Sequence, residues 1–171
     1  MTIELHDGSA GRYEVLLAIS MDISVFASDW AYCDRLSTYV AKMISHNRAD
    51  SLLYSNLLSS ALNELLETAH RNHGAAGDFS CTVLRAADRD RIELRIPSQS
   101  EDLSFYRDAI ERLSSPDIAE SYRAALFSDG EIDPSIGLME LAVDYNAKLS
   151  IDAVDTAVRL TAELILEDTV Q

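Results

Sequence analysis

The sequence is short of basic residues, and this shortage argues against polyanionic partners. Its 171 residues include 14 lysines and arginines against 29 aspartates and glutamates, for a formal net charge of -15. A chain with this charge repels nucleic-acid phosphates and anionic lipid. We therefore expect neither nucleic acid nor a membrane surface as a partner.

Long hydrophobic runs and paired cysteines are lacking as well. No apolar stretch approaches the roughly 20 residues of a membrane span, and Met1–Asp7 shows no basic stretch followed by an apolar one. We therefore expect a cytoplasmic protein. Cys33 and Cys81 are isolated, and the histidines show no metal-ligand spacing. We interpret both cysteines as buried small hydrophobic residues rather than as ligands or redox groups.

Length and composition indicate one domain of ordinary size. With 47% hydrophobic and 25% charged residues, the chain has the composition of a globular protein with one core. No stretch is rich enough in Pro, Gly or Ser to be a linker, and the sequence contains no internal repeat. We predict a single domain over residues 1–171, with strands and a helix in residues 1–50.

Helical and strand-like patterns together predict an α+β fold. Apolar residues at three-to-four spacing indicate helices, and apolar or alternating runs indicate strands. The predicted strands are Ile3–Leu5, Tyr13–Ile19, Phe79–Ala86, Arg91–Ile96, Lys148–Val154 and Ala157–Leu166. The predicted helices run from Ser28 or Asp29 to Ile44 and over Ser51–Asn72, Asp102–Leu113, Pro116–Phe127 and Pro134–Tyr145. We expect a two-layer α/β sandwich in which a mixed sheet carries helices on one face and exposes the other.

Local signals add detail at the ends of these elements. The apolar run Tyr13–Ile19 predicts a buried strand. Ser28 or Asp29 is the candidate cap of the first of these helices, and Pro116 is expected at the first position of its helix. Asp133 is expected to cap the helix that Pro134 begins.

The longest predicted helix, Ser51–Asn72, carries a polar row beside its apolar stripe. The stripe predicts a face that packs on the sheet. It consists of Leu52, Leu53, Leu57, Leu58, Ala61, Leu62, Leu65, Leu66 and Ala69. At roughly 100° per residue, Glu64 and Thr68 lie about 40° apart at the edge of the stripe, and Asn72 follows. This row is either a plain border of a buried surface or part of a binding site.

The segment Asn63-Glu-Leu-Leu-Glu-Thr-Ala-His70 resembles the N-box helix of histidine-kinase-like (GHKL) ATPases. In that superfamily a Glu on this helix polarises a water or hydroxyl, and an Asn four residues later helps to hold the magnesium that bridges the phosphates. Glu64 matches the first position, and Thr68 stands at the second. The resemblance implies a catalytic role for Glu64 and makes Thr68 the candidate metal ligand. We take Thr68 and Asn72, the next residue of the row, as candidates for holding the cofactor, ATP with Mg²⁺.

A second segment, Ser135–Lys148, is similar to the later glycine box of the same superfamily and its helix, with Gly137 at the matching position. A small residue at a helix amino terminus lets backbone N–H groups approach a phosphate closely, so Gly137 is a further cofactor-binding candidate. The alternative is an ordinary capped helix. The order of elements over residues 51–166, the nucleotide-site-like core, most resembles SiaB-type regulatory kinases of bacterial partner-switching systems. That resemblance implies a small STAS-domain antagonist of an anti-sigma factor as the partner.

The chain departs from the superfamily where the nucleotide base binds. Typical members carry Asp-x-Gly-x-Gly after the strand that corresponds to Arg91–Ile96, whereas this chain has Pro97-Ser-Gln-Ser-Glu-Asp102 and no glycine before Gly130. Two functions therefore stay open. One is a partner-binding regulatory module with weak or no ATP binding. The other is an active ATP-dependent serine/threonine kinase in which Glu64 orients the acceptor hydroxyl.

Two aromatic residues are candidates for a partner surface. Trp30 and Tyr32 are of the residue types that anchor protein interfaces, and we expect them to contact a protein partner or a second copy in a homodimer. The alternative is that both lie in the core.

Overall fold

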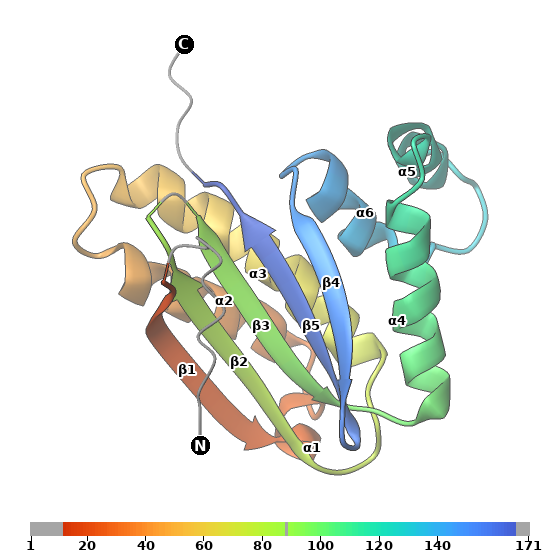
Figure 1. Cartoon of the computed structure of the whole chain (residues 1–171), viewed down its shortest axis with the longest axis horizontal. Coiled ribbons are helices and arrows are strands. Elements are labelled where there is room, and N and C mark those ends of the chain that lie inside the picture. The colour runs from red at the N-terminus through yellow and green to blue at the C-terminus, as the bar shows by residue number, and fades with distance from the viewer. Residues whose placement is uncertain (1–11, 88, 167–171) are drawn as a thin grey trace, which may run out of the picture.

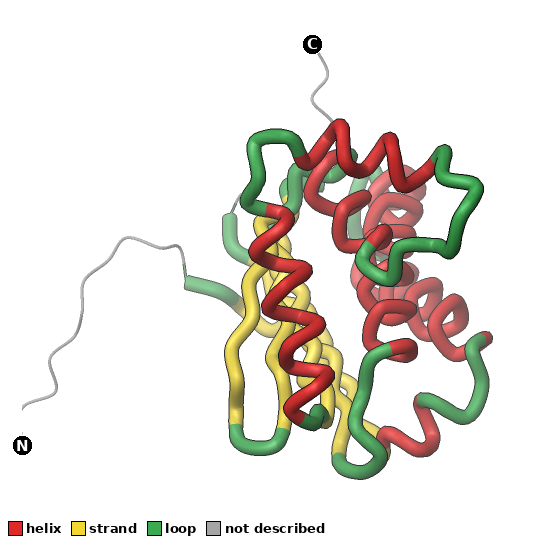
Figure 2. The backbone as a smooth tube through the Cα atoms, turned by 90° about the vertical axis from the view of Figure 1, so that its right-hand side faces the viewer, coloured by secondary structure: helices red, strands yellow, loops and turns green. Residues whose placement is uncertain are grey.

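Strands and helices lie in two layers, which Figure 2 shows edge-on, in the computed structural model of residues 12–87 and 89–166. The strands of this part of the chain are β1 (Glu14–Asp22), β2 (Asp78–Arg85), β3 (Asp90–Pro97), β4 (Lys148–Val154) and β5 (Ala157–Leu164). Its helices are α1 (Ile23–Phe26), α2 (Ala31–Ser45), α3 (Ser51–Arg71), α4 (Ser100–Leu113), α5 (Ile118–Leu126) and α6 (Ile136–Val143). The predicted α+β class and sandwich are confirmed. The predicted strand Ile3–Leu5 lies outside the described residues.

The sheet of the described strands is antiparallel throughout, in the order β1-β2-β3-β5-β4, so the prediction of a mixed sheet is wrong. The reason lies in the connections. Two long helices, α2 and α3, follow β1 as an antiparallel pair and return the chain to the end of the sheet at which β1 finished. Asp22 therefore faces Asp78 in the register of β1 and β2. β3 and β4 do run the same way, but β5 lies between them.

One face of the sheet carries helices and the other is polar. Figure 1 shows α2 and α3 behind the sheet and α4 running beside the edge strand β4. The alternation predicted for β5 is confirmed: Val158, Leu160, Ala162 and Leu164 are buried, and the residues between them are half-buried on the opposite face. On that open face Arg91 donates a hydrogen bond to Glu163 across β3 and β5.

Helix α3 supplies much of the core. Leu58, Leu62 and Leu65 have at most 1% of their surface exposed, as the apolar stripe predicted. The first turn differs, because Leu52 is 77% exposed and Leu53 is 40% exposed. Burial on this helix thus begins at Tyr54, and the stripe predicted from spacing alone was one turn too long.

The ends of several elements differ from the predictions. β1 is an edge strand that pairs only with β2 among the described strands, and none of its residues is fully buried, so its predicted burial is wrong. Helix α5 begins at Ile118, two residues after Pro116, which is therefore not in the first helical position. Asp29 does accept a hydrogen bond from the amide of Ala31, the first residue of α2, at 2.9 Å.

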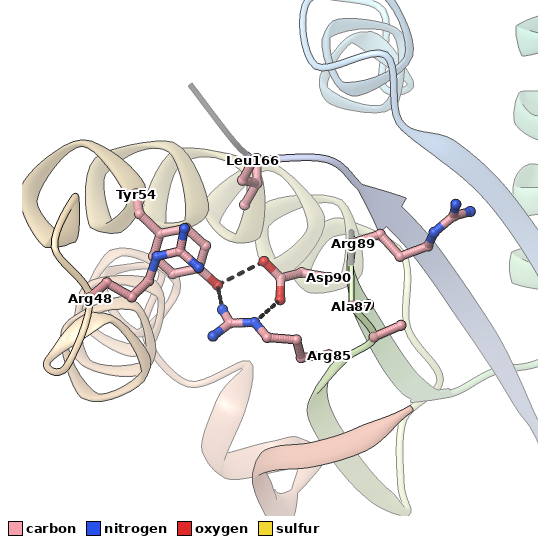
Figure 3. Close-up of a pocket in the computed structure, with 8 residues that line it drawn as sticks. Arg48, Tyr54, Arg85, Ala87, Arg89, Asp90 and Leu166 are labelled. Atoms are coloured by element: carbon pink, nitrogen blue, oxygen red, sulfur yellow. Dashed lines mark hydrogen bonds and ion pairs between the residues drawn. The ribbon is translucent and has the colours of Figure 1, made fainter. Parts of the chain in front are cut away.

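A buried polar cluster ties the start of α3 to the β2–β3 hairpin (Figure 3). The hydroxyl of Tyr54 donates a hydrogen bond to Asp90 over 2.9 Å and accepts one from Arg85. Asp90 is only 4% exposed. Arg85 also donates to Asp90 over 2.7 Å. The guanidinium of Arg48 stacks on the Tyr54 ring and forms a bidentate pair with Asp50. The hollow beside this cluster measures about 30 Å³, which is room for about one water, so we assign the cluster a structural role.

Both cysteines are buried and free, as predicted, and desolvation raises the pKa of the Cys33 and Cys81 thiols to about 12. None of the helices in residues 12–87 and 89–166 combines the length and the hydropathy that a membrane span requires.

The burial of α3 gives a direct test of the core. Leu62→Asp places an unpaired charge at a position with no exposed surface, and we expect it to cost more than about 4 kcal/mol of unfolding free energy. Leu52→Asp is the matched control, because it makes the same change at an exposed position in the first turn, where a negative charge suits the helix dipole. We expect it to change stability by no more than about 0.5 kcal/mol. Urea unfolding of both variants measures the difference, and equal losses would contradict the assigned faces.

Candidate functional site

The predicted site residues Glu64 and Gly137 meet where α3 packs against α6. A Cβ added to Gly137 would lie 2.5 Å from Oε2 of Glu64, a distance that real side chains do not adopt. The absence of a side chain at Gly137 therefore makes room for the Glu64 carboxyl group. Two candidates that the resemblance names thus lie side by side, and the glycine accommodates a carboxylate of the same chain.

The surroundings of Glu64 are acidic and partly desolvated. Burial, together with the charges of Glu140 and Glu67, raises the pKa of Glu64 to about 7, and Arg71 acts in the opposite direction. Burial and nearby carboxylates also raise the pKa of Glu140. Near neutral pH, Glu64 is thus divided between its protonated and charged forms, as a proton-transferring group requires.

Thr68 and Asn72 use their polar groups within α3. The Thr68 side chain has no exposed surface, and its hydroxyl donates to the backbone carbonyl of Glu64 over 2.9 Å. The Asn72 amide donates to the backbone carbonyl of Thr68 over 3.0 Å. Both side chains therefore return to the helix backbone, as short polar side chains often do.

Helix α4 packs into the core beside the end of α3. Tyr106 has no exposed surface, and its hydroxyl donates to the backbone carbonyl of Asn72 over 2.9 Å. Ala109, one turn later, is also buried. The segment at which the resemblance expects the glycine-rich loop of GHKL ATPases is thus a helix anchored by a large aromatic residue.

The amino terminus of α6 already holds a carboxylate. Asp133 accepts hydrogen bonds from the amide of Ser135 at 2.8 Å and from its hydroxyl at 2.7 Å. Pro134 and Ser135 form a turn, and α6 begins only at Ile136 with Ser135 in the cap position, so the prediction that Asp133 caps a helix begun by Pro134 is wrong. Arg112 of α4 donates to Asp133 over 2.9 Å and to the Ser135 hydroxyl over 3.2 Å. A phosphate that approached this helix end would compete with Asp133.

The arrangement does not fit a magnesium–ATP complex. Thr68 is enclosed, Asn72 is bonded to its own helix, and the space at Gly137 is filled by Glu64. Among the residues that the structure describes, no group of three or more His, Cys, Asp or Glu side chains is placed to hold a metal ion. The carboxylates around Glu64 also repel phosphate.

The two aromatic candidates lie at the start of α2. Trp30 is 42% exposed, packs edge-on against His70 at 4.9 Å between ring centroids, and carries the guanidinium of Arg71 at 5.0 Å. Tyr32 is half-buried. Trp30 thus keeps enough surface to contact a partner, and its interface role stays a prediction.

Sequence reasoning missed two residues that shape the site. Glu140 follows Gly137 by three positions on α6, and residues three apart are neighbours on a helix surface. This spacing could have identified Glu140 from the sequence. Tyr106 had no such signal, because its burial depends on how α4 packs against the end of α3.

No family model matches this chain, and no curated protein matches it. The resemblance to GHKL ATPases therefore rests on Glu64, on Gly137 and on the order of the elements that carry them.

The raised pKa of Glu64 predicts a pH-dependent loss of stability. Because the folded-state pKa of about 7 exceeds the ordinary value of 4.5, the contribution of Glu64 is complete below about pH 4.5 and is lost as the pH rises to about 7. We expect Glu64→Gln to lose less stability than the parent chain between about pH 5 and about pH 8. Glu111→Gln, at an exposed position of α4, is the control and should keep the parent profile. Urea unfolding across this range measures the effect, and parallel profiles for the parent and Glu64→Gln would contradict it.

Proposed function

We propose that this chain is a signalling regulator that acts by binding a protein partner on a GHKL-like framework and binds ATP weakly or not at all. The single observation that supports this most is the position of the Glu64 carboxyl group. It fills the space at Gly137, where the resemblance expects backbone N–H groups to meet phosphate.

The neighbouring contacts support the same proposal. The hydroxyl of Thr68 and the amide of Asn72 stabilise the helix that carries them. Tyr106 of α4 packs against the end of that helix, so a side chain of the protein itself joins α3 to α4. Because the protein's own side chains occupy this site, we propose that the chain acts through its surface, by binding a protein partner.

A small STAS-domain antagonist is the partner class that we propose, on the strength of the resemblance to SiaB-type regulators. The output would then be an anti-sigma factor or a similar regulator in a partner-switching pathway. A homodimer is compatible with the same role.

A second candidate function, an ATP-dependent serine/threonine protein kinase, is favoured by one observation. The pKa of Glu64, raised to about 7, suits a group that accepts a proton from an acceptor hydroxyl near neutral pH. The kinase must bind ATP, whereas the partner-binding module binds it weakly or not at all, so nucleotide binding distinguishes the two functions.

Thermal melting of the full chain with and without millimolar Mg-ATP separates the two functions. A ligand at about 100 times its dissociation constant adds about 2.7 kcal/mol of stability, which corresponds to a rise of roughly 5–10 °C in Tm for a domain of this size. We expect no rise beyond that produced by MgCl₂ alone. A rise of several degrees that Glu64→Ala abolishes and Glu111→Ala retains, together with slow ATP hydrolysis, would replace the module with the kinase.

A further inference from the structure

Three large apolar side chains are exposed where α5 ends and the next loop begins. Leu126 is 50% exposed, Phe127 is 84% exposed and Ile132 is 78% exposed. We call these three residues the 126–132 surface; Figure 1 shows its loop between α5 and α6. Phe127 and Ile132 are five residues apart, so their Cα atoms lie within about 18 Å of each other. Exposed apolar residues gathered in this way mark interaction sites.

A cavity adjoins this surface and shares Ile132 with it. The cavity measures about 390 Å³ and lies between α4 and the loop that leads into α6. Its apolar walls come from Phe105, Ala109, Ile132 and Pro134. It is open to solvent and far larger than the hollow of about 30 Å³ beside Asp90, so it can accept a side chain of a partner.

The surroundings of the cavity are acidic. Asp108 and Glu131 line it, and Asp129 lies in the same loop. The basic residue in the lining, Arg112, is engaged by Asp133 and Ser135. From Ser100 to Ser135 the sequence contains nine acidic residues and three basic ones. A second copy of this chain would bring the same negative charge to this surface, and like charges that face each other oppose binding.

We propose that the 126–132 surface and its cavity bind a basic segment of a partner protein. An apolar side chain of that segment enters the cavity, and flanking lysines or arginines face Asp108, Asp129 and Glu131. The proposal rests on the proposed function, in that the chain acts through a protein partner, and it adds which surface is used and what chemistry the partner offers. Apolar anchoring supplies affinity, while the opposite charges select the partner and speed its association.

Two synthetic peptides of equal length test this proposal on the full chain. Both carry leucines at three-to-four spacing, and they differ only in having lysines or glutamates at the other positions. Fluorescence anisotropy of the labelled peptides measures binding. We expect saturable binding of the lysine peptide, weakened by salt, and none of the glutamate peptide.

Matched variants separate the surface from the overall charge. Phe127→Ser with Ile132→Ser should weaken binding of the lysine peptide about tenfold or more, whereas Leu52→Ser, at an equally exposed leucine of α3, should not. Asp129→Asn with Glu131→Gln should weaken it more than Asp34→Asn with Asp152→Asn, which removes two exposed charges elsewhere.

Failure to bind the lysine peptide, or binding that the Phe127 and Ile132 changes leave intact, would overturn this assignment. That failure is distinguishable from failure of the proposed function, because the latter is detected by the Mg-ATP shift without any peptide. If the chain bound Mg-ATP and still bound the peptide through Phe127, the proposed binding surface would stand and the proposed function as a module without ATP binding would fail.

Discussion

Helix α3 holds the two layers together, and the other elements are positioned by what packs on it. Its buried residues from Tyr54 to Ala69 meet the sheet, α2 covers it from the side, and α6 packs beside it. Because Glu64 lies on the flank of this helix that faces α6, its environment is set by the packing of helices rather than by its own sequence neighbours. The desolvation of its carboxyl group follows from that placement.

Glu64 and Gly137 show that a side chain of the protein itself lies where the resemblance puts a nucleotide. A carboxylate and a glycine face each other across α3 and α6, yet the glycine receives the carboxylate directly. Around them, a threonine, an asparagine and a tyrosine form hydrogen bonds to the backbone of the same helix. The polar groups of all three residues thus contribute to the folded chain, in keeping with the proposed partner-binding module.

The sequence predicted those parts of the fold that local patterns control. Periodicity located the five described strands and the five longer helices, because the apolar residues of these segments recur at strand or helix spacing. It did not predict the antiparallel pairing throughout, the exposed Leu52 or the edge position of β1, since each depends on partners distant in the chain. At the site, the resemblance named Glu64 and Gly137 as separate candidates, and their contact was not predicted. The hydrogen bond of Thr68 to the carbonyl of Glu64 is a local tendency of threonine in helices. The burial of Tyr106 arises only once α4 has packed against the end of α3.

The buried cluster around Asp90 also fixes how the hairpin pairs. Side chains alternate between the two faces of a strand, so a slip of β3 by one residue would turn Asp90 toward the open face and send Arg91 into the core. Tyr54 would then lose the acceptor for its hydroxyl, and Arg85 would lose its counter-charge. One carboxylate at the start of β3 thus penalises every misaligned pairing of β2 with β3, and this discrimination against wrong structures needs no contact beyond those of the correct one.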